Sequence, residues 1–386
     1  MFWDTRCRLS LCLLGFLSVT AAFPALAGDK KDGNRNFRVL YWNTQNGVWS
    51  GQGDNYDTFV KWVNEKNPDV CVWIEAATVF KTDSKETIKD PLQRYLPDGW
   101  AELASRYGHT YVWKSGQRDN YPQVITSKYP IENVLQSIGN QKDTVVRHGF
   151  GQARIKVGEQ TINFVTVHLY PFGHLTADIR EPYELKQKRL AREAAQKAYR
   201  DALEGGNATE EQLASLKEEM ERTAQEHRNL RKTVYDKSLK NSEGEYYRRM
   251  EMEYILKHTV GQSDKPEKEC WLMCGDFNSR SPKDNFKYRW MDSSLSFITH
   301  RLIEADAPEY FDIVAEHYPG IFCKSMMSDA RIDFVYVTKP LLRASTKVSC
   351  GTDWYTKQRE WEPYPHFKIP SDHIPVMVDF NLGKIK

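Results

Sequence analysis

Short apolar runs separated by turn residues make up most of the chain after residue 36. The run Val70–Ile74 is apolar at every position, which is typical of a strand buried on both faces. Helical spacing is clear in residues 56–65 but rare between the other runs. The pattern therefore favours two β-sheets packed face to face with flanking helices over a doubly wound sheet. We expect the remaining strands at residues 37–42, 123–126, 150–157, 162–167, 270–274, 332–338 and 374–380.

Residues 181–259 follow a different pattern, nearly free of Pro and rich in Ala, Glu, Lys and Arg. Thr209 and Gln212 have the spacing of a helix-capping box. Apolar residues then recur at a 3,4 spacing, which predicts a seam between packed helices. We expect a helical hairpin inserted at about residues 181–245 and a third helix over about 245–257. The seam of the second helix contains Leu213, Leu216, Met220, Thr223, His227, Leu230 and Val234.

The charges of this segment are nearly balanced, so a solvated, salt-bridged surface is the simplest interpretation of them. A partner-docking arm is the alternative interpretation. We expect His227 at the edge of the hairpin core rather than as a ligand. The sequence indicates no obligate protein partner.

The N-terminal residues have the order of a secretory signal peptide. Arg6 and Arg8 precede a mostly apolar stretch, and Ala25-Leu26-Ala27 is an A-x-A cleavage site. The stretch is shorter than the roughly 20 residues that a membrane-spanning helix needs. We therefore expect residues 1–27 to be removed, residues 28–36 to be flexible and the remaining domain to be secreted or periplasmic.

The composition excludes some classes of protein without changing this picture. The chain has 386 residues, of which 40% are hydrophobic and 27% charged, as expected for one large or two small globular domains. A formal net charge of +2 excludes a protein that binds nucleic acid over its whole surface, although a local basic groove is allowed. Cys71 and Cys274 are expected in the core, and Cys323 and Cys350 are candidates for a disulfide. The absence of a C-x-x-C pair argues against a zinc–thiolate site.

Polar side chains follow several of the predicted strands. Asp276 and Asn278 come after an apolar run, and the two-residue period of a strand places them on one face. Asn43 ends the first strand and Glu75 ends the second. Carboxylates and amides at such positions suit Mg²⁺, which takes one or two carboxylates and keeps several waters. A surface glutamate at a strand end is the alternative for Glu75, and the neighbouring polar residues argue against it.

Histidines and further carboxylates follow the same pattern. His168 ends a predicted strand, and Asp372 and His373 precede the last one. One histidine can contact a phosphate oxygen while the other activates water. Asp333 begins a strand and is expected to orient a histidine, with pairing to an arginine as the alternative. The loop Arg147-His148-Gly149 is a weaker candidate for a phosphate-binding cation.

Three short motifs, in this order, resemble the endonuclease/exonuclease/phosphatase (deoxyribonuclease I-like) superfamily. They are Gly275-Asp276-Phe277-Asn278, Arg331-Ile332-Asp333 and Ser371-Asp372-His373. The resemblance covers nearly the whole mature chain and implies an α+β fold, a four-layered αββα sandwich. It implies Asn43, Glu75 and Asp372 on the side of a Mg²⁺ or Mn²⁺ ion, and His168, Asp276, Asn278, Asp333 and His373 as catalytic residues.

Some positions depart from the patterns of individual branches of the superfamily. Phe172 stands where repair nucleases carry Asn, which argues against cleavage at abasic sites. Residues 327–331 lack the Pro-x-Trp-Cys-Asp-Arg motif of inositol polyphosphate 5-phosphatases, which argues against polyphosphate phosphatase activity. The aromatic residues within 354–367 are expected to pack over the rim of the site, with base stacking or lipid contact as the alternative.

The sequence thus predicts an exported, metal-dependent phosphoesterase of nuclease-like or sphingomyelinase-like type. The ester could belong to nucleic acid, to a phospholipid head group or to a small molecule. A non-catalytic binding module on the same fold, with the helical insertion as its docking arm, is the alternative. The complete set of site residues argues against that alternative.

Overall fold

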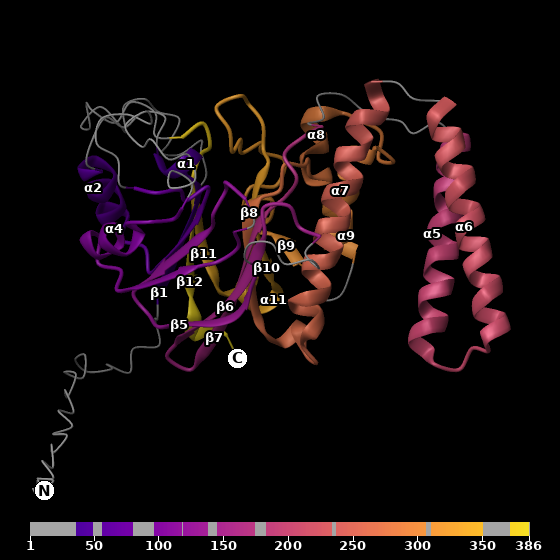
Figure 1. Cartoon of the computed structure of the whole chain (residues 1–386). Coiled ribbons are helices and arrows are strands. Elements are labelled where there is room, and N and C mark those ends of the chain that lie inside the picture. The colour runs from indigo at the N-terminus through magenta and orange to yellow at the C-terminus, as the bar shows by residue number, and fades with distance from the viewer. Residues whose placement is uncertain are drawn as a thin grey trace, which may run out of the picture. The chain divides into compact units, whose positions relative to one another are not determined.

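The computed structural model describes residues 36–48, 56–79, 96–117, 119–137, 145–173, 183–233, 237–305, 310–349 and 371–385. Two six-stranded sheets lie within these residues (Figure 1). The first sheet contains β1 (Asn36–Asn43), β2 (Val70–Ile74), β3 (Tyr111–Lys114), β4 (Val124–Ser127), β11 (Ser345–Ser349) and β12 (Val376–Asn381). The second contains β5 (Ile131–Gln136), β6 (Phe150–Val157), β7 (Gln160–His168), β8 (Cys270–Asp276), β9 (Tyr310–Asp312) and β10 (Asp333–Thr338).

Each sheet is mixed, and its order brings distant segments together. The first has the order β11-β12-β1-β2-β4-β3 and the second β5-β6-β7-β8-β10-β9. Each sheet contains one parallel pair near its centre, β1 with β2 and β7 with β8. The strands of such a pair end at the same edge of the sheet, so the polar residues that follow them can meet there.

The main core lies between the two sheets. Val39 and Tyr41 of β1 point into it and share it with Phe164 of β7 and Leu272 of β8. The alternate β1 residues, including Trp42, point outward and pack with the helices α2 (Asp57–Lys66) and α4 (Trp100–Arg106). This alternation follows from the two-residue period of a strand that is buried on both faces.

Helices also cover the outer face of the second sheet. Met252 and Ile255 of α7 (Lys237–His258) and Ile303 of α9 (Ile298–Ala305) pack against Phe334 of β10 and Trp271 of β8. The order of layers is therefore helix, sheet, sheet, helix, which confirms the predicted αββα sandwich of the α+β class. The short helices α8 (Asn285–Tyr288), α10 (Ile313–His317) and α11 (Lys339–Ala344) lie in the connections.

The predicted helical hairpin is present as α5 (Tyr183–Gly205) and α6 (Glu210–Thr233). Its capping box is formed: the Thr209 amide donates to Gln212 Oε1 at 2.9 Å, and the Gln212 amide donates to Thr209 Oγ1 at 3.2 Å. His227 is buried in the seam, 3.3 Å from an Arg192 nitrogen.

The third helix begins earlier than expected, at Lys237 rather than near 245. Gly244 lies inside this helix, at a point where the helix approaches the backbone of Phe172. A Cβ atom at Gly244 would lie 2.5 Å from the Phe172 carbonyl oxygen. The insertion boundary expected at about 245 thus falls inside a helix that belongs to the outer layer of the sandwich.

The predicted strands all occur, most within one or two residues of their expected bounds, and four strands were missed. Of the missed strands, β5 has no buried side chain, β3 has one and β11 has two, and β9 has only three residues. Cys71 and Cys274 are buried, as predicted. No helix in the described part of the chain has the length and apolar character to cross a membrane. The signal peptide, residues 28–35, Cys350 and the aromatic loop 354–367 lie outside the described residues, so the predictions about them, including the disulfide, stay predictions.

Candidate catalytic site

The ends of five strands from both sheets meet at one place. Asn43 is in register with Ile74 at the end of the β1–β2 pair, and His168 is in register with Asp276 at the end of the β7–β8 pair. Asp333 begins β10 directly opposite Asp276, because β8 and β10 are antiparallel. Nδ2 of Asn43 donates to Asp276 Oδ2 at 3.2 Å and thereby joins the two sheets at this edge.

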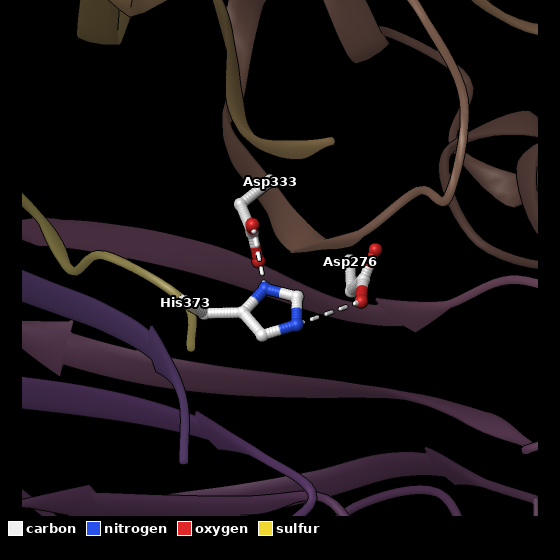
Figure 2. Close-up of side chains that lie close together, drawn as sticks. All are labelled: Asp276, Asp333 and His373. Carbon is white, nitrogen blue, oxygen red and sulfur yellow. Dashed lines mark hydrogen bonds and ion pairs between the residues drawn. The ribbon is translucent and has the colours of Figure 1, made fainter. Parts of the chain in front are cut away.

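Asp333 holds the imidazole of His373 in place (Figure 2). The distance from His373 Nδ1 to Asp333 Oδ2 is 2.8 Å, and the other ring nitrogen lies 3.8 Å from Asp276 Oδ2. Tyr41 Oη donates to Asp333 Oδ1 at 2.5 Å, and Ser325 Oγ donates to Oδ2 at 2.7 Å. The ring is thus oriented with Nε2 toward Asp276. Arg331, the arginine nearest to Asp333 in the sequence, pairs with Asp284 and Asp312 instead.

Burial and neighbouring charges shift the protonation of this cluster. Burial lowers the pKa of His373, but the adjacent Asp333 outweighs it, helped by Asp276, and raises the pKa to about 10. Burial, followed by the charge of Asp333, raises the pKa of Asp276 to about 8 in spite of His373. Burial lowers the pKa of His168 well below its ordinary value, and the nearby histidines act in the same direction. The site therefore holds a protonated His373, a neutral His168 and an Asp276 whose pKa is close to neutral pH.

Oxygen atoms suited to a divalent cation gather beside Asp276. Asn43 Nδ2 is 3.3 Å from Glu75 Oε1, and the Asn46 amide donates to Glu75 Oε2 at 3.2 Å. Oδ1 of Asn46 and Oδ1 of Asp372 are buried without a hydrogen bond from the described residues. Burial raises the pKa of Glu75, which means that its negative charge lacks sufficient compensation. Buried carboxylate and amide oxygens of this kind fit Mg²⁺ or Mn²⁺.

A second grouping of possible metal ligands overlaps with this one. Asp276, Asp333 and His373 each offer an atom within 4.8 Å of the others. However, His373 Nδ1 and both oxygens of Asp333 already take part in hydrogen bonds. On the Glu75 side, by contrast, Asn46 Oδ1 and Asp372 Oδ1 accept no hydrogen bond from the described residues.

The backbone around the site adopts a left-handed conformation that only glycine adopts without strain. Glu75 has φ 55° and Asn278 has φ 49°. All four residues of the short turn α1 (Gln45–Val48), which follows Asn43, also have positive φ. Such strain persists only where the surrounding structure enforces it. Here the Asn278 amide donates to Asp276 Oδ1, and Glu75 accepts hydrogen bonds from Asn43 and Asn46.

Asn278 and Gly275 fix the end of β8. The Asn278 amide donates to Asp276 Oδ1 at 2.9 Å, and its side chain donates to the Leu169 carbonyl at 3.0 Å, so it links Asp276 to the loop after His168. A Cβ atom at Gly275 would lie 1.8 Å from the Val167 carbonyl oxygen. The glycine of the Gly-Asp-x-Asn motif is therefore required by the close approach of β7 and β8.

A second aspartate–histidine pair lies behind His168. The His148 ring is in contact with the His168 ring, with centroids 4.3 Å apart, and its Nδ1 is 2.6 Å from Asp119 Oδ2. Tyr121 packs edge-on against both rings. His148 Nε2 and His168 Nδ1 are buried and have no hydrogen-bond partner among the described residues. The sequence offered His148 only as a weak candidate, and it gave no signal for Asp119 or Tyr121, which lie in a loop.

The helix α7 anchors the loops that carry these histidines. Glu251 accepts hydrogen bonds from the Arg147 amide at 2.8 Å and the Tyr170 amide at 2.7 Å. Arg248 donates to the carbonyl oxygens of Tyr170 and Phe172 at 2.9 and 2.8 Å. Burial raises the pKa of Glu251 to about 7. The polar residues of α7 thus support the site from behind.

The site residues expected from the sequence all lie in this region, together with several that were missed. His168 Nε2 is 3.9 Å from Asp276 Oδ2, and Asp372 Oδ1 is 3.8 Å from His373 Nε2. The missed residues are Tyr41, Asn46, Asp119, Tyr121, His148 as a partner of His168, Glu251 and Ser325. Only the unusual run of polar residues after Asn43 could have signalled one of them, Asn46.

The chain is similar to one family model and to several solved structures. A model of the Endonuclease/Exonuclease/phosphatase family matches residues 40–373. An AP endonuclease from Archaeoglobus fulgidus is similar at 14% identity and a TM-score of 0.43, over 89% of this chain and 99% of that one. The TDP2 of D. rerio complexed with single strand DNA product is similar at 10% identity and a TM-score of 0.45, over 90% and 99% of the chains. An endonuclease/exonuclease/phosphatase family protein from Leptotrichia buccalis is similar at 14% identity and a TM-score of 0.44, over 89% and 99%. No curated protein sequence matches the chain.

Proposed function

The chain belongs to the endonuclease/exonuclease/phosphatase family, and we propose from this premise that it hydrolyses a phosphate ester with the help of a divalent metal ion. The observation that supports the proposal most strongly is the meeting of Asn43, Glu75, Asp276, Asp333 and His373 at the strand ends of both sheets. These residues come from five separate segments of the chain. Burying their charged side chains together does little to stabilise the fold. Their arrangement is instead typical of a site that binds an anionic substrate and a cation.

Glu75, with Asn43 and Asp372, would hold Mg²⁺ or Mn²⁺. Bound there, the cation would neutralise charge that develops on the phosphoryl oxygen and the leaving group. Asn46 Oδ1 and Asp372 Oδ1, which are buried and accept no hydrogen bond from the described residues, support this placement.

Asp276 is the residue best suited to activate the attacking water. Its pKa of about 8 lies near neutral pH, where a general base is most effective. His373 is protonated at that pH, because its pKa is raised to about 10, so it acts as a cation or proton donor toward the phosphate rather than as the base. Asp333 keeps the His373 ring in that orientation.

Two further residues complete the proposed reaction. His168 is neutral and lies 3.9 Å from Asp276, where its imidazole can donate a hydrogen bond to a phosphate oxygen. Asn278 fixes the Asp276 carboxylate and is proposed to contact the scissile phosphate. Water then attacks in line with the leaving group as Asp276 takes its proton.

We also propose that the protein is exported. The support is the order of a positive start, an apolar stretch and Ala25-Leu26-Ala27 in the sequence. N-terminal sequencing of the protein recovered from its natural compartment tests this. A mature start at Gly28 is expected, and a start at Met1 would contradict it.

A substrate panel with a matched inactive variant tests the proposed function. The purified protein would be incubated with a chromogenic phosphodiester, a phosphomonoester, plasmid DNA and sphingomyelin vesicles, each with Mg²⁺, Mn²⁺ or EDTA. We expect turnover of at least one substrate that depends on metal and falls about 10²–10⁴-fold in Asp276→Asn. No turnover of any substrate, or turnover that is equal in Asp276→Asn, would favour the non-catalytic binding module.

A further inference from the structure

Glu251 of α7 is a buried carboxylate that the proposed reaction does not use. The residue is 2% exposed and lies between two loops, outside the catalytic cluster. Its Oε1 accepts a hydrogen bond from the Arg147 amide at 2.8 Å, and its Oε2 accepts one from the Tyr170 amide at 2.7 Å. Each oxygen of the carboxylate therefore holds a different segment of the chain.

The two segments carry the histidines whose rings are in contact. Arg147 directly precedes His148, and Tyr170 follows His168 by two residues. The centroids of the two imidazole rings are 4.3 Å apart. A shift of one segment relative to the other would therefore disturb this contact and move the His168 ring, which is proposed to bind a phosphate oxygen.

The segment after His168 is also bonded to the end of β8. The Leu169 amide donates to the Asp276 carbonyl at 2.9 Å, and the Leu169 carbonyl accepts a hydrogen bond from Asn278 Nδ2 at 3.0 Å. Tyr170 is the next residue, and its amide is the one that Glu251 binds. Glu251 thus fixes the backbone on the side of the site where the phosphate is proposed to lie.

The ionised form of Glu251 is the form that matches two backbone amides. A carboxylate accepts hydrogen bonds on both oxygens, whereas a carboxylic acid carries a donor on one of them. A backbone N–H is a donor, so a protonated Glu251 would keep one of its two partners and leave the other amide buried without an acceptor. Such an orphaned group costs about 1–3 kcal/mol, which favours a shift of the loop that carries it.

The charges that act on Glu251 come from its own helix and from a loop that it holds. Burial raises the pKa of Glu251 to about 7, and the positive charges of Arg248 and Arg147 act in the opposite direction. His148, the next titratable residue along that loop, is paired with Asp119. The two arginines stay charged at every pH of interest, so protonation of Glu251 changes the number of amides that it can hold without changing its surroundings.

We propose that Glu251 is a positioning residue of the phosphoester site, and that its carboxylate form holds the loops of His148 and His168 in the arrangement that hydrolysis needs. Protonation would release one of the loops and slow the reaction, although Glu251 is outside the proposed set of substrate and metal contacts. The inference rests on the proposed function for the rate and on the two hydrogen bonds alone for the position of the loops. A purely structural role is the alternative, and it predicts no effect that follows the protonation of Glu251.

Two variants on the same helix test the effect on the rate. Glu251→Gln keeps the size of the side chain and copies the protonated form, because the amide is neutral at every pH. The matched control is Glu253→Gln, which changes an exposed glutamate two residues later on α7. Initial rates on a soluble chromogenic phosphodiester would be measured at saturating Mg²⁺ from about pH 5.5 to about pH 8.5, on both sides of the pKa of Glu251.

We expect Glu251→Gln to lower kcat about 10–100-fold at the alkaline end of this range, since a small displacement of a group at the site is enough for such a loss. The gap should shrink to less than about fivefold at the acidic end, where the wild type carries an equally neutral side chain. Glu253→Gln should stay within about twofold of wild type throughout. A gap of constant size would overturn the inference in favour of the structural role, and so would the absence of any gap.

Nuclear magnetic resonance tests the position of the loops without any turnover. In metal-free protein with isotope-labelled arginine and tyrosine, the amide signals of Arg147 and Tyr170 should titrate together with a pKa of about 7 in wild type and in Glu253→Gln. Glu251→Gln should lose this titration. Wild-type signals that stay fixed would overturn the inference even if Glu251→Gln did not fold, and so would a titration that persists in that variant. A wild type that hydrolyses no phosphoester would contradict the proposed function instead, and the titration would still decide whether Glu251 holds the loops.

Discussion

Replacing Asp333 by Asn tests the electrostatic core of the proposed site. The amide keeps the shape of the side chain but removes the charge that lies 2.8 Å from His373 Nδ1. In the wild-type protein the pKa of His373 is about 10, against an ordinary value near 6.5. At roughly 1.4 kcal/mol for each pH unit, this difference favours the protonated ring by about 5 kcal/mol.

Without the carboxylate, burial dominates, and the pKa of His373 should fall to its ordinary value or below. The histidine is then neutral at pH 7 and loses its role as a cation or proton donor toward the phosphate. We expect kcat/KM to fall about 10²–10⁴-fold. The assay combines initial rates on a chromogenic phosphodiester with a nuclear magnetic resonance titration of the His373 ring in metal-free protein.

Ser325→Ala provides the matched control, because it leaves the Asp333 charge in place. It removes the hydrogen bond that Ser325 Oγ donates to Asp333 Oδ2 and the two that Oγ accepts from the Ile332 and Asp333 amides. We expect this change to cost about 1–3 kcal/mol of stability and to leave His373 protonated at pH 7. If Asp333→Asn kept its activity within a few-fold and the His373 titration did not move, the assignment of Asp333 as the residue that orients and charges His373 would be refuted.

Three other predictions follow from the site. Gly275→Ala should lower the free energy of unfolding by about 3 kcal/mol, because the alanine Cβ atom would lie 1.8 Å from the Val167 carbonyl oxygen. An unchanged urea midpoint would contradict the close approach of β7 and β8. In EDTA the protein should lose stability as the pH rises from about 4 to about 8. The pKa of Asp276 is raised to about 8 in the folded state, so the folded protein holds this proton more tightly than the unfolded chain does. Saturating Mg²⁺ should flatten this slope in thermal melts, and a rise of stability with pH in EDTA would contradict the raised pKa. His148→Phe should keep the ring contact with His168 and lose the pair with Asp119. We expect kcat/KM to fall about 10–100-fold with little change in melting temperature. Unchanged kinetics would show that the Asp119–His148 pair is purely structural.

The sequence predicted the centre of each sheet well and its edges poorly. Strands such as β2 are buried on both faces, so every residue is apolar and the run stands out. An edge strand such as β5 has mostly exposed side chains, and its position depends on pairing with β6, which local sequence does not encode. The start of α7 was placed too late for a related reason: its first half looks polar, and its packing depends on contacts with loops far away in the chain.

The same distinction applies to the site. Asn43, Glu75 and Asp276 could be predicted because they follow recognisable strands, and parallel strands bring their ends to one edge. Ser325 and Asp119 belong to loops, and their contacts with Asp333 and His148 arise only after the chain has folded. No periodic pattern marks such residues, so only the structure could place them.

The most direct test of metal-dependent hydrolysis at this site is the dependence of the rate on Mg²⁺ concentration. It would be measured with one soluble phosphodiester for wild type, Glu75→Gln and Asp276→Asn. The account predicts saturable activation of the wild type that EDTA abolishes. It predicts a higher half-saturating Mg²⁺ concentration for Glu75→Gln, and for Asp276→Asn a lower maximal rate at a similar half-saturation. Hydrolysis that is independent of metal, or that both variants catalyse as the wild type does, would contradict it.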